Sequence, residues 1–594
     1  MNVIRATPMF LILFFRFFDI VRDKTKIIGS EYDYIIVGGG SAGSVLANRL
    51  SADPQNSVLL LEAGSDENLI SDNPAFAPLL QMTTIDWAYL TEPQKYACFG
   101  LKGQRSRWPR GKVLGGSSVL NNMIFIRGNH KDYDNWAKNG AFGWSWKDVF
   151  PYFLKYEDNT DTNLLQNGFH ASGGYLTIST PSYSTVLRTA FLEAGKSSGY
   201  QIVDVNGATQ TGFAPVQSFL RNGRRCSTNK AFIKPIRHRP NLHILLFSFV
   251  TKIIFDKFKR ARAVTFDRFG QTFIVNARKE IIISAGAINS PQLLMLSGIG
   301  QQKDLEKLQI PVISDLPVGS NLQDHPFVMG TNCLVDVPVT SVLLRFLNPK
   351  DIFRYVFLRT GPGILSTAVE AVAFIKTEYA NASDDYPDIQ YTFLSGGLAS
   401  DGGKILKEIF GMKTEVYNSY FRPFDFDDTF TIHTTLLRPK SRGYVKLRST
   451  NPYQHPIIQP NYLSHPEDIL RLVSGMQSAL RLAESFPFKK LGSRLFPTNL
   501  PGCKRFRRFS KEQLECFART LTLTLYHPAG TCKMGAVNDP TTVVDPELRV
   551  KGVSGLRVVD ASIMPNIVSG NLNAPTVMIA EKAADMILKK RFWL

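Results

Sequence analysis

The sequence predicts an α/β protein in which a doubly wound, Rossmann-like domain is interleaved with an α+β domain. A strand, a glycine-rich turn, a helix and a second strand follow one another over residues 32–61. A further buried strand over residues 279–283 runs into a turn of small residues, and residues 575–590 carry apolar side chains at helical spacing. Because 594 residues are too many for one hydrophobic core, two domains are expected.

The first of these segments is expected to be a strand–helix–strand unit. Residues 32–37 form a short segment that is rich in β-branched side chains and is followed by glycines, as in a buried parallel strand. A helix is expected from Ser41 to Ser51. A second strand over residues 58–61 ends at Glu62.

The glycines of this unit have separate physical roles. Gly38 allows the tight turn, Gly40 lets the backbone approach a pyrophosphate, and Gly43 lets the helix pack closely on the strand. The phosphates then lie at the helix N-terminus, where free N–H groups and the helix dipole favour an anion. Glu62 can accept hydrogen bonds from a ribose. The unit predicts a dinucleotide site with the candidate residues Gly38, Gly40, Ser41, Ala42, Gly43, Glu62 and Ala63.

The later parts of the chain are less regular. The strand over residues 279–283 is expected to lead into a helix that begins at Pro291. Residues 160–245 are rich in turns, and residues 330–525 alternate between strand-like and helical patterns. These two stretches are interpreted as the second domain and its lids.

Composition excludes several classes of protein. The net charge is +19, but the basic clusters are scattered and no recognition motif accompanies them, so no nucleic-acid partner is expected. The six cysteines form no CxxC pair and the nine histidines form no HExxH motif, so no metal site is expected. Cysteine spacing leaves the disulfide state and the cellular compartment open.

The first 30 residues read as a leader or signal segment. An apolar run over residues 8–15 follows Arg5, as in a secretory signal, but Arg16 interrupts it and no small-residue cleavage site follows. A secreted protein is the favoured interpretation, with an uncleaved leader as the alternative. No window is long enough to span a bilayer. The oligomeric state is left open.

A histidine and an asparagine near the C-terminus are the candidates for chemistry. His527 lies in the string YHPAGTCKMG over residues 526–535, and Asn571 lies in SGNLNAP over residues 569–575. A neutral imidazole can accept a proton near pH 7, and an amide can donate to a developing alkoxide without titrating. His325 is expected to be a structural hydrogen-bonding residue. No role is expected for the remaining histidines considered, which are His130, His238, His243, His433, His455 and His465.

Four further segments carry a resemblance to a known family. They are residues 111–121 (GKVLGGSSVLN), 286–300 (GAINSPQLLMLSGIG), 317–325 (PVGSNLQDH) and 437–443 (LRPKSRG). With these segments the chain resembles the glucose–methanol–choline (GMC) flavoprotein oxidoreductases over nearly its whole length. Within that family it looks most like the insect branch that resembles glucose dehydrogenase.

The resemblance implies FAD as the cofactor. Non-covalent binding is expected because residues 119–122 contain no histidine for flavin attachment. The resemblance adds further candidate cofactor-binding residues. They are Val113, Gly115, Gly116, Ser117, Ser118, Asn121, Val250, Asp560 and Ala561.

The resemblance also implies a reaction. An alcohol or sugar would lose its hydroxyl proton to His527 and a hydride to flavin N5, with Asn571 orienting the substrate oxygen. A quinone or dioxygen would reoxidise the flavin. A pyridine-nucleotide flavin reductase is disfavoured, since no second complete GxGxxG is present. A catalytically inert flavin-binding or ligand-binding protein that kept the fold is the remaining alternative.

These expectations divide the chain into four parts. Residues 1–30 would be the leader, and residues 31–330 a mostly FAD-binding region. Residues 331–525 would form most of the substrate-binding domain and its lids. Residues 526–594 would return to the FAD-binding domain with the catalytic pair.

Overall fold

The computed structural model describes residues 29–342, 345 and 348–589. The apolar run expected to form a signal segment lies outside these described residues. Within them, no helix is long and apolar enough to cross a membrane.

The first sheet contains the predicted strand–helix–strand unit. Strand β1 (Glu31–Val37) is followed by helix α2 (Ser41–Leu50) and strand β2 (Val58–Leu61), which confirms the three predicted elements. The sheet order is β10-β2-β1-β13-β12-β11, with β24 beside β13. Strands β10, β2, β1, β13 and β24 are parallel, whereas β12 and β11 join as an antiparallel hairpin extension. The added strands are β10 (Leu242–Leu245), β11 (Phe249–Phe255), β12 (Ala261–Arg268), β13 (Gln271–Ile283) and β24 (Leu556–Val558).

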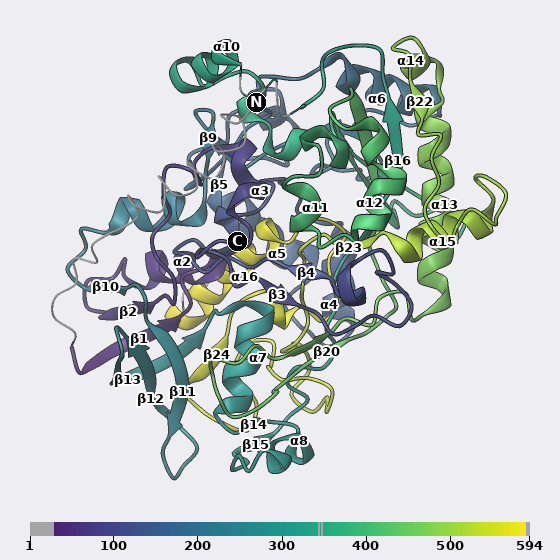
Figure 1. Ribbon diagram of the computed structural model, residues 1–594. Helices are drawn as coiled ribbons and strands as arrows, with labels where there is room; N and C mark the ends of the chain where they lie inside the picture. The colour runs from purple at the N-terminus through teal and green to yellow at the C-terminus, as the bar shows by residue number, and fades with distance from the viewer. Residues whose placement is uncertain (1–28, 343–344, 346–347, 590–594) are drawn as a thin grey trace.

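The end of the chain returns to its beginning. Helix α16 (Asn573–Leu588) packs beside α2, as the yellow and purple helices in Figure 1 show. Arg49 of α2 forms an ion pair with the fully buried Glu581 of α16, at 2.6 Å. Ser41 Oγ donates to Asn573 Oδ1 at 2.7 Å, so the first turns of the two helices are joined by a hydrogen bond.

Helix α7 (Gly286–Leu296) begins earlier than the sequence predicts. It starts at Gly286, and Pro291 lies inside it, so the predicted start at Pro291 is wrong. A proline has no N–H to donate to the carbonyl four residues earlier, which is that of Ala287. Thr531 Oγ1 donates to this carbonyl at 2.7 Å instead. A partner 244 residues away therefore compensates for the proline within the helix.

The second sheet is antiparallel and forms a wall opposite the first. Its order is β22-β16-β19-β18-β17-β7, with β23 beside β16. Helices α13 (Pro466–Ala483) and α15 (Lys511–Thr520) pack against it on the side away from α7 and α16 (Figure 1). The strands are β7 (Gly212–Pro215), β16 (Pro326–Leu334), β17 (Val369–Ile375), β18 (Ile389–Leu394), β19 (Thr429–Leu436), β22 (Arg494–Leu495) and β23 (Thr522–Thr524).

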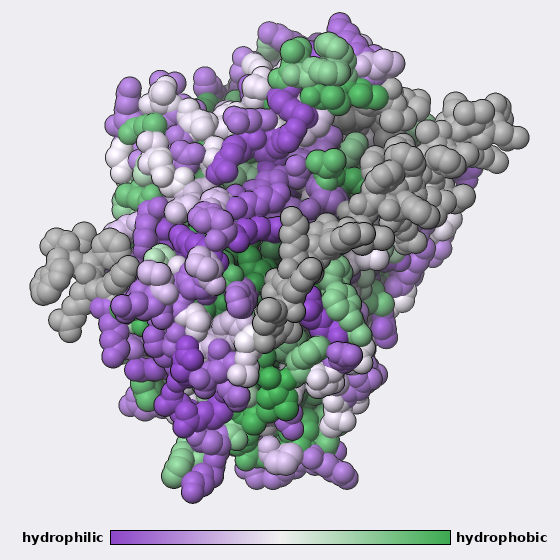
Figure 2. Space-filling view, turned by 90° about the vertical axis from the view of Figure 1, so that its left-hand side faces the viewer, coloured by the Kyte–Doolittle hydropathy of each residue, from purple (hydrophilic) through white to green (hydrophobic). Residues whose placement is uncertain are grey.

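A short helical segment exposes apolar side chains at the surface. Helix α10 (Pro349–Phe353) and the π-helical turn η7 (Arg354–Leu358) expose Phe353 by 55% and Phe357 by 68%. Figure 2 shows an apolar cluster at the top of this face, above a largely hydrophilic surface.

Candidate active site

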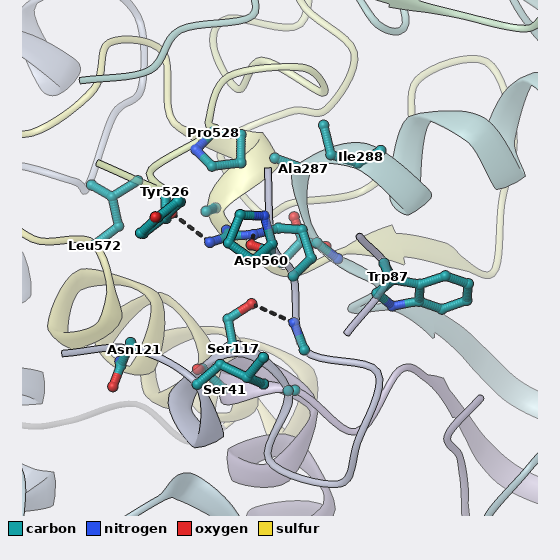
Figure 3. Close-up of a pocket in the computed structure, with 18 of the residues that line it drawn as sticks. Ser41, Trp87, Ser117, Asn121, Ala287, Ile288, Tyr526, Pro528, Asp560 and Leu572 are labelled. Carbon is teal, nitrogen blue, oxygen red and sulfur yellow. Dashed lines mark hydrogen bonds between the residues drawn. The ribbon is translucent and has the colours of Figure 1, made fainter. Parts of the chain in front are cut away.

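A pocket lies between the two sheets and collects residues that are far apart in the chain. Its wall includes the glycine turn after β1, the start of α7, residues 526–528 and residues 571–573, together with side chains of the second sheet. Figure 3 shows Ser41, Ser117 and Asn121 on one side of the cavity, with Tyr526 and Leu572 on another. The pocket therefore joins the predicted dinucleotide site to both candidate catalytic residues.

The glycine turn leaves room for a dinucleotide. Gly38 has φ +99, and a Cβ atom on Gly43 would lie 1.9 Å from the Gly38 carbonyl oxygen, so a side chain at Gly43 would clash with the turn. A Cβ on Gly40 would meet nothing closer than the Cα of Gly116 at 3.8 Å, which leaves space on the pocket side. No side chain caps the N-terminus of α2 and no acidic residue lies in its first turn. These features fit a diphosphate at this helix end.

Glu62 lies beside the glycine turn. Its Oε2 accepts the Gly39 N–H and its Oε1 accepts the Gly64 N–H, both at 2.8 Å. Burial raises the pKa of this carboxyl to about 7, although the two N–H bonds act in the opposite direction. Each oxygen retains a lone pair for a ribose hydroxyl. Ala63 and Val250 line the pocket beside it.

The segment over residues 113–121 is divided between the pocket wall and the layer behind it. Gly116, Ser117 and Asn121 line the pocket. The Gly115 N–H donates to the Gly39 carbonyl at 2.7 Å, and Ser118 Oγ donates to the Gly115 carbonyl at 2.6 Å. The pocket wall does not include Gly43, Val113, Gly115 or Ser118, and Val113 is buried in a small apolar cluster. These four residues lie next to the predicted cofactor site and shape it.

Asp560 lies on the wall but its carboxylate is already bound. It accepts the Gly286 N–H at 2.9 Å and the Ser290 hydroxyl at 2.6 Å, at the start of α7, and the Ser562 N–H at 2.8 Å. Asp560 therefore holds the beginning of α7 at the pocket, and Ala561 lines the wall beside it.

His527 and Asn571 meet at the pocket, as a catalytic pair requires. Asn571 Nδ2 lies 3.4 Å from His527 Nε2. Gln390 Nε2 donates to Asn571 Oδ1 at 3.2 Å, which directs the amide N–H₂ group of Asn571 toward the histidine. One oxygen of a bound molecule can therefore contact both the imidazole Nε2 and the amide Nδ2.

The protonation state of His527 follows from its neighbour His325. His325 Nε2 lies 2.9 Å from the Leu437 carbonyl oxygen, which can only accept, so this nitrogen carries a proton. Burial lowers the pKa of His325 to about 3, so its ring is neutral and its Nδ1 is an acceptor. The His527 Nδ1–H then donates to His325 Nδ1 at 2.9 Å. His527 Nε2 is left without a proton and is the acceptor that faces the Asn571 amide. The prediction that His325 is a structural hydrogen-bonding residue is confirmed.

The electrostatic surroundings keep His527 neutral. Burial lowers its pKa well below the usual 6.5, and the nearby His325 and Arg110 lower it further. Its backbone N–H donates to Asp324 Oδ1 at 2.8 Å, and Arg110 Nη2 donates to the carbonyl of Tyr526 at 2.5 Å. Tyr526 itself has φ +66, a conformation that neighbours must hold in place. The histidine is thus fixed through both backbone and side chain.

Several pocket residues had no signal in the sequence. Phe327, Thr392 and His433 come from the second sheet and line the pocket, although His433 was expected to have no role. Alternation along residues 389–394 indicates which side chains share a face, but not which face meets the pocket. Within the described ranges no group of three or more histidine, cysteine or acidic residues could hold a metal ion.

The cysteines form one disulfide. Cys503 and Cys516 are joined, 13 residues apart in the sequence. Cys532 follows His527 by five residues in the sequence and is buried. Burial raises the pKa of its thiol above the usual range. It therefore has the character of a small buried apolar residue.

The chain is similar to known proteins over most of its length. Residues 32–327 and 439–580 match two sequence profiles, both described as GMC oxidoreductase. The chain is 42% identical over 566 residues to glucose dehydrogenase [FAD, quinone] of Drosophila melanogaster, covering 95% of this chain and 87% of that protein. It is 39% identical over 567 residues to oxygen-dependent choline dehydrogenase of Brucella anthropi, covering 94% and 96%. The crystal structure of pyridoxine 4-oxidase from Mesorbium loti superimposes with a TM-score of 0.79 at 32% identity, covering 94% of this chain and 100% of that one.

Proposed function

The chain belongs to the GMC oxidoreductase family of FAD-dependent enzymes, and from this premise we propose that it oxidises the CH–OH group of an alcohol or sugar. The observation that carries the proposal is the unprotonated Nε2 of His527, which lies 3.4 Å from Asn571 Nδ2 on the wall of the pocket that also contains the glycine turn.

The proposed residue roles follow from the hydrogen bonds of the pair. His527 Nε2 accepts the hydroxyl proton of the substrate, which breaks the O–H bond and leaves an imidazolium. Asn571 Nδ2 donates to the same oxygen and stabilises the negative charge that develops there. Gln390 keeps that amide in the donating orientation. FAD, when bound, supplies the acceptor for the hydride of the carbinol carbon.

The cofactor would be held by residues at both ends of the cradle. Gly40 and the first turn of α2 would face the diphosphate, and Glu62 would face the ribose. Ser117 and Asn121 would lie along the flavin side of the pocket. The absence of histidine at residues 119–122 favours non-covalent binding, so acid precipitation should release FAD into the supernatant.

Either a quinone or dioxygen would reoxidise the flavin. The name of one relative gives quinone as its acceptor, and the name of another says that it depends on oxygen. A reoxidation assay with a quinone dye under argon, beside one with oxygen-saturated buffer, separates a dehydrogenase from an oxidase.

We also propose that the protein is secreted. The Cys503–Cys516 disulfide supports this location, because such bonds persist in oxidising compartments. Recovery of the protein from the medium of expressing insect cells, with this bond intact by mass spectrometry, tests the proposal. A protein retained in the cells with reduced Cys503 and Cys516 would contradict it.

The test of the enzyme itself is flavin reduction without oxygen. Purified holoprotein is mixed with glucose, choline and simple alcohols, and bleaching of the flavin is followed by stopped flow. We expect at least one alcohol or sugar to bleach the flavin, and we expect His527→Ala to suppress that bleaching. A flavin-loaded protein that no alcohol bleaches would instead support an inert flavin-binding protein.

A further inference from the structure

A group of polar side chains on the second sheet faces the pocket and has no assigned role. Thr392 of β18 and His433 of β19 are direct partners in the antiparallel register, so their side chains share one face. Both line the pocket. The ring of Phe327 lies beside that of His433, with centroids 4.7 Å apart.

Neither polar side chain has a protein partner among the described residues. Thr392 is 3% exposed and its Oγ1 is a buried atom without a hydrogen bond. No hydrogen bond joins the imidazole of His433 to any described residue. Burial lowers the pKa of His433 to about 3, so the ring is neutral and offers one donor and one acceptor. The Thr392 hydroxyl is a buried polar atom, and such atoms are nearly always hydrogen-bonded. The imidazole of His433 is half-buried and opens into the same pocket, so a ligand is expected to hydrogen-bond this pair.

The pair lies on the same sheet face as a residue that contacts Asn571. Gln390, which holds Asn571, is two residues before Thr392 on the same strand and therefore on the same face. Two residues along a strand span roughly 7 Å. A molecule whose hydroxyl meets His527 and Asn571 can thus present a second polar group to Thr392 and His433 from the far side of a six-membered ring.

The charged and apolar side chains of the pocket wall limit the class of substrate that can bind beside Thr392 and His433. Two carboxylates and one guanidinium line the pocket. Glu62 and Asp560 already accept backbone N–H groups, and Arg110 already donates to the carbonyl of Tyr526. Apolar side chains of the pocket wall include Phe327, which lies against His433, and Val369, Leu394 and Leu525. A trimethylammonium group has no donor or acceptor to offer, so it would leave the Thr392 hydroxyl and the His433 imidazole unsatisfied.

From this arrangement we propose that Thr392 and His433 form a specificity site that hydrogen-bonds a second hydroxyl of the substrate, and that the substrate is an uncharged polyol of the sugar type. The inference rests on the proposed oxidation of a CH–OH group and adds the substrate class to it. The apolar side chains of the same wall pack against the C–H faces of the ring.

The test uses trans-cyclohexane-1,4-diol and cyclohexanol, which differ by one hydroxyl across the ring. We expect the wild-type holoenzyme to bind and reduce its flavin with the diol roughly tenfold more efficiently than with cyclohexanol. Thr392→Val and His433→Phe should remove most of that preference, whereas His433→Gln, which keeps hydrogen-bonding groups, should retain part of it. Choline should be a poorer substrate than the diol.

Thr434→Val is the matched control. Thr434 follows His433 in β19, is fully buried and also has an unpartnered Oγ1, but it is not on the pocket wall. It should keep the wild-type preference for the diol. A preference that is unchanged in the Thr392 and His433 variants, or lost equally in Thr434→Val, would overturn the proposal, and so would choline as the better substrate.

A binding measurement separates this proposal from the proposed reaction. Diol and cyclohexanol are titrated into the His527→Ala holoprotein, and binding is read from the change in the flavin absorption spectrum. Tighter binding of the diol that depends on Thr392 and His433, with no reduction in the wild type, would refute the reaction alone. Reduction without any discrimination between the two alcohols would refute the specificity site alone.

Discussion

The Nδ1 atoms of His325 and His527 lie 2.9 Å apart, and this contact determines which nitrogen of His527 is basic. Because the Leu437 carbonyl holds the proton of His325 on Nε2, the His325 Nδ1 can only accept while the ring is neutral. The proton of His527 is therefore held on Nδ1, away from the pocket. Nε2 is the atom that faces Asn571 and is free to act as a base.

Removing the acceptor on His325 should impair catalysis without loss of the cofactor. In His325→Phe, His527 can adopt either tautomer and can rotate, so flavin reduction should slow about tenfold or more. His325→Asn can accept from His527 through its amide oxygen and should recover part of the rate. The measurement is the limiting reduction rate at saturating alcohol, with flavin content as the control. Equal rates in both variants and the wild type would contradict a positioning role.

Removing the base itself should have a larger effect. His527→Ala should lower the rate of flavin reduction by alcohol about a hundredfold or more. FAD should stay bound, because the glycine turn and Glu62 that form the predicted cradle are unchanged. Rapid-reaction spectroscopy gives the rate and the flavin-to-protein ratio confirms loading. A rate near that of the wild type would require a different base.

The pH dependence should reflect the buried position of His527. Its pKa is lowered below the ordinary 6.5, chiefly by burial, so the neutral base persists as the pH falls through 6.5. The reduction rate should therefore stay level across that point and decline only at more acidic pH, where the imidazole becomes protonated. Reduction rates measured across the acid range test this. His527→Ala is the control, because it should lack the decline at acidic pH (the acid limb). A midpoint at or above 6.5 would contradict the environment described for His527.

A side chain at Gly40 should exclude FAD while leaving the fold intact. A Cβ at this position meets no protein atom closer than 3.8 Å, so Gly40→Val should fold with little loss of stability. The same side chain projects toward the expected diphosphate and should yield protein poor in flavin. Gly43→Val is the contrasting variant, since its Cβ would lie 1.9 Å from the Gly38 carbonyl and should reduce stability itself. Thermal unfolding and flavin content measure the two effects, and a fully loaded Gly40→Val would show that the diphosphate lies elsewhere.

Local patterns predicted the first elements because their causes are local. The tight turn at Gly38 and the close packing at Gly43 depend on residues that are neighbours in the sequence. Strands β1 and β2 and helix α2 therefore form where the sequence predicts them. The start of α7 was missed because it depends on Asp560 and Thr531, which lie 274 and 244 residues away from their partners. No window of sequence contains such contacts.

The same distinction applies to the site. His527 and Asn571 were singled out because each lies in a distinctive string, and both line the pocket. His325 was expected to form structural hydrogen bonds. That His325 bonds to His527 itself depends on a contact across 202 residues. His433 lies in an ordinary strand, and its position on the pocket wall follows only from the pairing of β18 with β19. Sequence patterns therefore indicated His527 and Asn571, which line the pocket, but gave no indication of the second-sheet residues beside them.

Gln390 Nε2 donates to Asn571 Oδ1 at 3.2 Å and so orients the amide of Asn571. Asn571→Ala removes the donor to the developing alkoxide and should slow flavin reduction, while the acid limb set by His527 remains. Asn571→Asp should be slower still, because a carboxylate repels the alkoxide. That carboxylate also favours the imidazolium form, so it should raise the pKa of His527 and shift the acid limb to higher pH. Asn571→His keeps a possible N–H donor and should retain part of the rate.

Stopped-flow reduction across pH for the three variants, each with confirmed FAD content, decides the matter. An aspartate variant with the rate and acid limb of the wild type would mean that charge beside the substrate oxygen is unimportant, and Asn571 would have no place in the catalytic pair.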